Sequence, residues 1–177
     1  MDVCVRELFS SLDAPSGVAL VALGGYGRAE LAPASDVDLL ILHDGARREE
    51  VAVLAERLLY PMWDAGLTVG HGVRTQEESL GLADERLDAA TAMLDGRWLA
   101  GDQELWPALS TALLRRLRED PRGFAERLRA DAESRRERFG SVSWLLEPEL
   151  KEGAGGLRDI HSLGWLAAVL REALTPD

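Results

Sequence analysis

The spacing of apolar and polar residues predicts that the first half of the chain is a small α/β domain. Continuous apolar runs over residues 18–23 and 39–42 are short and bounded by glycine or polar positions, which is typical of buried strands. Apolar residues at helical spacing indicate helices over residues 2–14 and 51–66. A third strand over residues 67–73 completes a strand–helix–strand unit, which favours a mixed sheet with helices on one face.

From residue 84 onward the pattern is helical. Asp102 is placed to cap one helix, and Asp120-Pro121 is a start signal for the next, because aspartate accepts free N–H groups and proline fits the first turn. These helices carry apolar stripes at Leu105, Leu109, Leu113 and Leu117, and at Phe124, Leu128 and Ala132. The sequence therefore predicts an α/β (α+β) fold, with a small mixed sheet in a domain over residues 1–83 and a helical domain over residues 84–177.

The composition restricts the kinds of partner. The net charge of -11 disfavours nonspecific nucleic-acid binding, which needs a basic surface to neutralise phosphates. No apolar run approaches the length of a membrane span. Cys4 is the single cysteine and cannot form an internal disulfide, which together with the lack of an apolar signal segment predicts a cytoplasmic protein.

Two carboxylates at the start of the second strand are the first candidates for chemistry. Asp36 and Asp38 are two residues apart, so on a strand their side chains point the same way, roughly 6.5–7 Å apart along the chain. The apolar run that follows them belongs in a core, where unpaired carboxylates are costly. A cation is therefore expected to face them, and divalent metal ions fit this pair.

A glycine-rich turn precedes these acids. Gly24, Gly25 and Gly27 lie where backbone must approach a ligand closely, and they open a short helix whose N–H groups attract anions. The turn therefore predicts a phosphate-binding site beside the metal site. A Rossmann dinucleotide site is disfavoured, because Glu30 stands where the third glycine of that motif belongs.

These residues carry a resemblance to a known superfamily. The stretch Gly24-Gly25-Tyr26-Gly27-Arg28-Ala29-Glu30-Leu31, followed by Ser35-Asp36-Val37-Asp38-Leu39, resembles the signature of the DNA polymerase beta-like nucleotidyltransferases. That signature is usually Gly-Ser, Arg-Gly-Glu and Asp-x-Asp. The double glycine with Tyr26 is most similar to the uridylyltransferases that modify the PII signal protein. Gly25 departs from the wider superfamily, in which a serine hydroxyl helps to hold the triphosphate.

Two later stretches resemble the same enzymes. The end of the third strand, Gly70-His71-Gly72-Val73-Arg74-Thr75, is similar to PII uridylyltransferases. The stretch Pro148–His161 closely resembles the Lys-x-Gly-x-Gly-Gly-Leu-Arg-Asp-Ile motif that they share with glutamine synthetase adenylyltransferases. This loop enters a helix whose inner face is expected at Ile160, Leu163, Ala167 and Leu170. A tight turn in which Asp159 complements the helix dipole is the alternative, purely structural interpretation.

The resemblance implies a metal-dependent nucleotidyltransferase. Two divalent ions, Mg²⁺, would bind Asp36 and Asp38. Asp95 is the candidate for a third carboxylate, which the third strand of the superfamily usually supplies and this strand lacks. The implied nucleotide-binding residues are Gly24, Gly25, Gly27, Arg28, Ser35, Lys151 and Arg158. Lys151 is the single lysine among 20 basic residues, which favours a dedicated role.

The same resemblance implies that UMP moves from UTP to a tyrosine of the PII protein, in the regulation of nitrogen metabolism, with ATP as the alternative donor. Neither nucleic acid nor a membrane is an expected partner. Such enzymes normally continue into phosphohydrolase and sensing domains, and nothing here matches either, so the chain is expected to correspond to their N-terminal part.

Several assignments have alternatives. His71 is a candidate to orient a phosphate, or an ordinary hydrogen-bonded histidine at a strand end. The basic cluster Arg135, Arg136 and Arg138 faces an acidic partner or a triphosphate, or is a solvated helix end. At the level of the whole chain, the alternatives are a nucleotidyltransferase that modifies another protein and an impaired module that senses nucleotide without transferring it.

Overall fold

The computed structural model describes residues 1–32, 35–140 and 149–171. It contains two compact units, Met1–Leu113 and Leu114–Asp177. The division falls within one helix, α6 (Leu105–Glu119), and lies further along the chain than the boundary expected after residue 83. Residues 33 and 34 of the loop before the acids, and Pro148 of the second glycine loop, lie outside the described residues.

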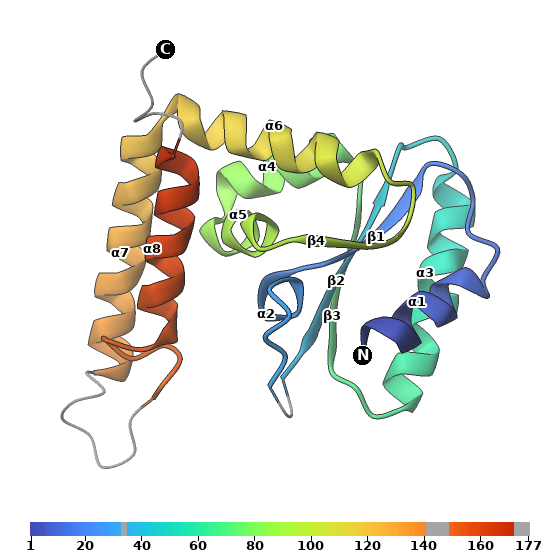
Figure 1. Cartoon of the computed structure of the whole chain (residues 1–177), viewed down its shortest axis with the longest axis horizontal. Coiled ribbons are helices and arrows are strands. Elements are labelled where there is room, and N and C mark those ends of the chain that lie inside the picture. The colour runs from blue at the N-terminus through green and yellow to red at the C-terminus, as the bar shows by residue number, and fades with distance from the viewer. Residues whose placement is uncertain (33–34, 141–148, 172–177) are drawn as a thin grey trace. The chain divides into compact units, whose positions relative to one another are not determined.

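The first unit is built on a four-stranded mixed sheet, which confirms the predicted fold class (Figure 1). The strand order is β3-β2-β1-β4; β1 is antiparallel to both of its neighbours, and β2 is parallel to β3. A parallel pair needs a crossover connection, and α3 (Arg48–Asp64) supplies it. The strands are β1 (Val18–Ala22), β2 (Val37–His43), β3 (Val69–Arg74) and β4 (Arg97–Gly101).

Both faces of the central strands are buried. On one face, α1 (Asp2–Ser10) and α3 share a core with alternate residues of β1 and β2, such as Leu20 and Ile41. The intervening residues, including Val21 and Leu40, are equally buried on the other face. The expectation of helices on one face is therefore wrong: α4 (Gln76–Glu85) and α5 (Leu87–Leu94) lie on the side opposite α3 (Figure 1). Burial on both faces explains the unbroken apolar runs.

The helical pattern predicted from residue 84 onward is wrong for residues 97–101, which form β4. This strand pairs with β1, with a register shift between Leu20 and Val21. A strand of five residues between two helices is too short for its alternation to stand out from helical spacing. Pairing with β1, which connects residues far apart in the sequence, decides its conformation.

The second unit is helical, as predicted. It contains the end of α6, then α7 (Pro121–Phe139) and α8 (Leu157–Leu170). The start signal Asp120-Pro121 is confirmed, since the Asp120 side chain accepts the Gly123 N–H at 2.9 Å. None of the helices in the described part of the chain combines the length and apolar composition that crossing a membrane requires.

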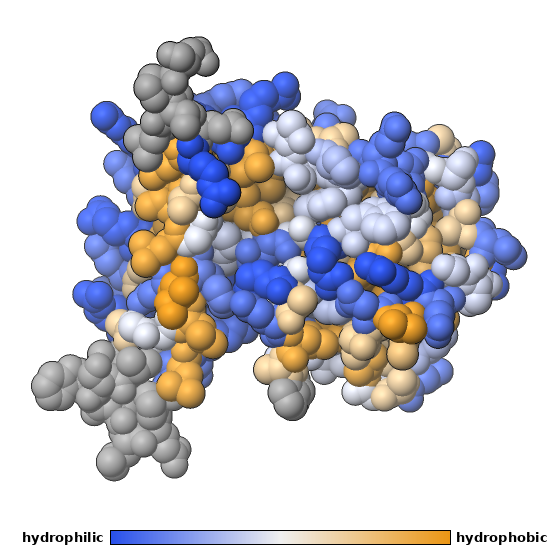
Figure 2. All heavy atoms as spheres, viewed as in Figure 1, coloured by the Kyte–Doolittle hydropathy of each residue, from blue (hydrophilic) through white to orange (hydrophobic). Residues whose placement is uncertain are grey.

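The buried face of α8 differs from the predicted one. Trp165 and Val169 are its buried residues, whereas Ile160 and Leu163 are 63% and 69% exposed. Figure 2 shows a strip of hydrophobic side chains along this helix. Leu157, the first residue of α8, is also exposed. The apolar stripe at Ile160 and Leu163 is real, but in this unit the neighbouring face, which carries the large Trp165 ring, packs inward.

Substitutions on the two faces of α8 are expected to lower the free energy of unfolding by different amounts. Trp165→Ala should lower the free energy of unfolding by about 3–5 kcal/mol, because it leaves a cavity in a buried site. Ile160→Gln and Leu163→Gln should each change it by less than about 0.5 kcal/mol, because these side chains already contact water. Urea denaturation of the three variants measures the difference. A large loss in either glutamine variant would contradict this orientation of the helix.

Candidate active site

The carboxylate of Asp38 lies between the glycine turn and the edge strand β3. The turn is α2 (Gly24–Gly27), which is separated from β1 by Leu23 alone, and the Leu23 N–H donates to the Asp38 carbonyl at 2.9 Å. A Cβ added to Gly24 would lie 3.5 Å from Asp38 Oδ2, and one added to Gly70 would lie 2.2 Å from Asp38 Oδ1. The sequence elements that predicted a metal site and a phosphate site are thus adjacent.

The predicted metal ligands are Asp36 and Asp38, and carboxylate oxygens are ligands of the kind that Mg²⁺ prefers. Asp36 immediately precedes β2 and is exposed, and Asp38 is half-buried within the strand. Across residues 1–32, 35–140 and 149–171, no three side chains of His, Cys, Asp or Glu gather as a metal site. Mg²⁺ is commonly bound by one or two carboxylates together with substrate phosphates, so two acids meet its requirement for hard oxygen ligands.

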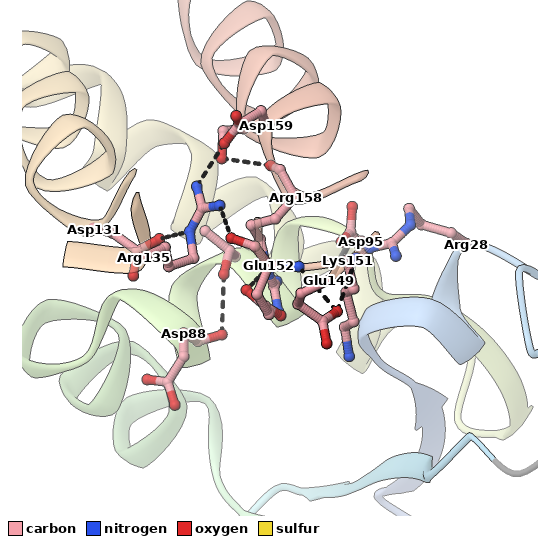
Figure 3. Close-up of polar contacts among 12 residues, drawn as sticks. Arg28, Asp88, Asp95, Asp131, Arg135, Glu149, Lys151, Glu152, Arg158 and Asp159 are labelled. Carbon is pink, nitrogen blue, oxygen red and sulfur yellow. Dashed lines mark hydrogen bonds and ion pairs between the residues drawn. The ribbon is translucent and has the colours of Figure 1, made fainter. Parts of the chain in front are cut away.

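Asp95, the candidate for a third carboxylate, is held by Arg28. It follows α5 directly, and its Oδ2 accepts a hydrogen bond and ion pair from Arg28 Nη1 (Figure 3). Its side chain is 10% exposed. Asp95 therefore fixes the arginine that follows the glycine turn and is not gathered with Asp36 and Asp38 in a group of three.

Arg28 is bound from two sides. Besides Asp95, Glu30 accepts from its Nε at 2.7 Å. Burial opposes the charge on the guanidinium, yet the pKa of Arg28 is raised because Glu30 and Asp95 stabilise the cation. The Arg-Ala-Glu part of the motif thus forms an ion-pair network at the end of the turn.

Gly27 and Arg97 explain how the turn is held, and sequence reasoning missed Arg97. A Cβ at Gly27 would lie 2.2 Å from the Asp95 carbonyl oxygen. Arg97, the first residue of β4, donates to the carbonyls of Gly27 and Tyr26 at 3.0 and 3.1 Å. Its guanidinium also pairs with Asp2 of α1 at 2.5 and 3.2 Å. Only the pairing of β4 with β1 brings Arg97 here, so no local sequence signal could identify it.

The remaining glycine-loop candidates have less crowded surroundings. The nearest atoms to a Cβ at Gly25 would be 3.8 Å away, so the position has room for a side chain although the sequence has none. Ser35 is exposed, and its N–H donates to the Ala32 carbonyl at 3.1 Å. Its proposed contact with nucleotide stays a prediction.

His71 lies on the other face of the sheet from Asp38. In the parallel register Asp38 pairs with Gly70, and His71 pairs with Leu39, whose side chain is in the core beneath α1 and α3. The His71 ring contacts Trp63 of α3 edge to face, with ring centroids 5.7 Å apart. The structure therefore favours the ordinary structural interpretation of His71.

In the second unit, buried Arg135 ties the second glycine loop to α7 (Figure 3). Its guanidinium donates to the carboxylates of Asp131 and Asp159 at 2.8 and 2.9 Å and to the Glu152 carbonyl at 3.2 Å. The Arg135 side chain is therefore not solvated, and its guanidinium is already bound by groups of the protein rather than by an external anion. Within the predicted basic cluster, Arg135 has a structural role.

Asp159 links this network to the backbone of the loop. Its Oδ2 accepts the Gly155 N–H at 2.8 Å, which corresponds to the structural alternative considered for the motif. Burial disfavours the carboxylate, yet the pKa of Asp159 lies below its usual range because Gly155 and Arg135 stabilise the charged form.

The second unit is therefore expected to lose stability in acid through Asp159. A lowered native-state pKa adds stability above the unfolded-state value, near 3.8, and that stability disappears as the pH falls through the native value. Asp159→Asn should cost about 1 kcal/mol at neutral pH, allowing for solvent screening, and should flatten the decline in unfolding free energy between about pH 5 and 2. Denaturant titrations over this range test it. Glu133→Gln removes the carboxylate of an exposed pair on α7 and is the control; it should change the free energy of unfolding at neutral pH by less than about 0.5 kcal/mol.

The two predicted basic residues of the loop differ in their surroundings. Arg158 donates to Glu152 at 3.0 Å, and its guanidinium lies 5.7 Å from the centre of the Trp165 ring. Lys151 is exposed, and its backbone N–H donates to Glu149 at 3.0 Å. Arg158 therefore stabilises the loop itself, and a nucleotide contact from either residue stays a prediction.

The chain is similar to known proteins along most of its length. The chain matches the family described as GlnD PII-uridylyltransferase over residues 123–177 and the Nucleotidyltransferase domain over residues 5–88. It is 46% identical over 164 residues to the bifunctional uridylyltransferase/uridylyl-removing enzyme of Streptomyces coelicolor, a match covering 90% of this chain and 20% of that enzyme.

Enzymes of the same name from Bordetella avium and Mycobacterium tuberculosis are 41% and 44% identical over 94% and 86% of this chain. The match covers 19% of each, so the chain spans about a fifth of the length of these relatives. Among solved structures, a chain from "Crystal structure of the toxin-antitoxin with AMP-PNP" aligns with 75% of this chain and 95% of its own length. Its identity is 17% and its TM-score 0.39.

Proposed function

Because the chain belongs to the PII-uridylyltransferase family and contains a nucleotidyltransferase domain, we propose that it transfers UMP from UTP to a tyrosine hydroxyl of the PII protein. The tyrosine hydroxyl loses its proton to water, and its oxygen forms a bond to the α-phosphorus of UTP. The bond between that phosphorus and the oxygen bridging to the β-phosphate breaks, and pyrophosphate leaves. This reaction would take place in the cytoplasm and serve nitrogen regulation.

The observation that carries this proposal is the position of Asp38. Its carboxylate lies against Gly24, the first residue of the turn proposed to hold the triphosphate. Gly24 has a φ of 52°, a left-handed conformation that favours glycine, and its lack of a side chain keeps the space beside the carboxylate open. A phosphate on the turn would therefore meet the acid that is proposed to bind metal.

Asp36 and Asp38 would hold two Mg²⁺ ions, which, when bound, neutralise charge on the reacting phosphate. The glycine turn would position the triphosphate through backbone N–H groups. Arg28, Ser35, Lys151 and Arg158 are proposed as further contacts. Arg28 already pairs with Glu30 and Asp95, so its positive charge is partly neutralised within the protein.

The second candidate is a module that binds nucleotide without transferring it. Two observations favour it: β3 contains no carboxylate, and Gly25 lacks the serine hydroxyl that the wider superfamily uses. ATP, with AMP transfer to PII or to another protein, is the alternative among the transfer reactions.

The test is incubation of the protein with a PII protein, Mg²⁺ and labelled UTP or ATP, followed by intact mass measurement. We expect PII to gain the mass of one UMP with UTP and no mass in the absence of divalent metal. Calorimetric titration with UTP and Mg²⁺ runs beside it. Binding without any mass gain would support the sensing module, and a gain of AMP from ATP alone would reassign the donor.

A further inference from the structure

The backbone conformation of Gly70 does not require glycine. It lies in β3, an edge strand, and is not among the glycines with positive φ. A glycine inside a strand weakens the strand and often marks a close approach by another group. The group that approaches Gly70 is the Asp38 carboxylate, its partner in the parallel register.

The contact leaves no room for a side chain at Gly70 while the Asp38 carboxylate keeps its position. A Cβ at Gly70 would lie 2.2 Å from Asp38 Oδ1 and 3.4 Å from Asp38 Cγ, while the nearest backbone atom, Asp38 Cα, would be 4.0 Å away. The backbone therefore tolerates alanine, and only the carboxylate must move. Because an aspartate side chain can rotate, the expected result is a displaced acid in an intact sheet.

We propose that Gly70 is a positioning residue for the metal-binding carboxylate of Asp38. Because Gly70 has no side chain, the carboxylate can occupy the position that a Cβ would otherwise take. The proposal rests on the proposed function, in which Asp38 binds divalent metal. It extends that function to a residue on the third strand, which contributes no carboxylate but shapes the site. Gly24 flanks the same carboxylate at a hypothetical Cβ distance of 3.5 Å, but its positive φ makes any substitution there strained for an unrelated reason.

Gly72 provides a matched control two residues further along the same strand. It shares the face of Gly70, and a Cβ there would lie 2.0 Å from Arg74 Nη1, the far end of a flexible side chain. The Arg74 side chain is long and flexible, so it can rotate away from an added methyl group. Gly70→Ala and Gly72→Ala therefore make the same change in the same strand and differ in which side chain is displaced.

The experiment measures Mn²⁺ binding by electron paramagnetic resonance, with transfer kinetics and melting temperature alongside. We expect Gly70→Ala to raise the Mn²⁺ dissociation constant at least about tenfold and to lower kcat by a similar factor, the range seen when the support of a metal ligand is removed. Gly72→Ala should leave both within about twofold of the original protein, and both variants should keep their melting temperature within about 3 °C.

A double-variant cycle tests whether Gly70→Ala changes Mn²⁺ binding through Asp38 or by another route. In the Asp38→Ala background, Gly70→Ala should weaken Mn²⁺ binding no further, because the group that it displaces is gone. Equal Mn²⁺ affinity in Gly70→Ala and Gly72→Ala, with Asp38→Ala clearly weaker, would overturn this inference alone. If Asp38→Ala binds Mn²⁺ normally, the metal assignment of the proposed function fails and the inference fails with it.

Discussion

Asp38→Asn is expected to reduce nucleotidyl transfer by at least about a thousandfold, equivalent to about 4 kcal/mol of transition-state stabilisation. Asparagine has the shape of aspartate but no charge, so it weakens a hard metal ion's binding without altering packing. Asp36→Asn should have an effect in the same direction. Initial rates at saturating UTP, with Mg²⁺ varied, measure the loss.

The melting temperature should change little in either variant, because Asp36 is exposed and Asp38 only half-buried. Asp64→Asn makes the same chemical change at an exposed residue at the end of α3 and should retain full activity. Retention of most transfer activity by both the Asp36 and the Asp38 variants would exclude this pair as the metal site.

The elements that local pattern predicted are those whose signals are strong and contiguous. The apolar runs of β1 and β2 are buried on both faces, so their continuity follows directly from where they lie. Asp120 and Pro121 start α7 through a cap that depends only on neighbouring residues. Elements of this kind need no knowledge of the tertiary structure.

The elements that were missed depend on pairing across the chain. The strand β4 forms because residues 97–101 complete the sheet beside β1, and the buried face of α8 is set by which side packs within its unit. A stripe such as Ile160 and Leu163 shows that a helix is amphipathic but not that the stripe is covered. Periodicity therefore predicted the helix correctly and its buried face wrongly.

The site divides in the same way. Asp36, Asp38 and the glycines are close in sequence, so the sequence alone predicts their motif. The structure places Asp38 next to Gly24. The supporting residues come from elsewhere: Gly70 from β3, Asp95 from the end of α5, and Arg97 from β4. The sequence offers Asp95 as a candidate carboxylate, but only the structure shows that Arg28 donates to it. Residues that position a site are identified by contacts that sequence spacing does not contain.

Gly27→Ala is the second substitution with a large expected effect, because it pushes the glycine turn away from its support. The added Cβ would meet the carbonyl oxygens of Asp95 at 2.2 Å and Ala22 at 3.0 Å, and backbone atoms cannot rotate aside as a side chain can. Overpacking of this kind costs about 1–3 kcal/mol of stability. The turn must also shift relative to Asp38, and a displacement of about 1 Å is sufficient to cost about a hundredfold in rate.

Two other glycines separate the effect of crowding from that of simply adding a methyl group. Gly25→Ala places its Cβ 3.8 Å from the nearest atoms and should keep the melting temperature of the original protein. Gly81→Ala, inside α4 with no atom within 4 Å, should keep both stability and transfer activity. Thermal unfolding and transfer rates of the three variants test this order. If Gly27→Ala matched Gly81→Ala in both measurements, the close packing of the turn against residue 95 would not position the nucleotide, and the carboxylates alone would account for the activity.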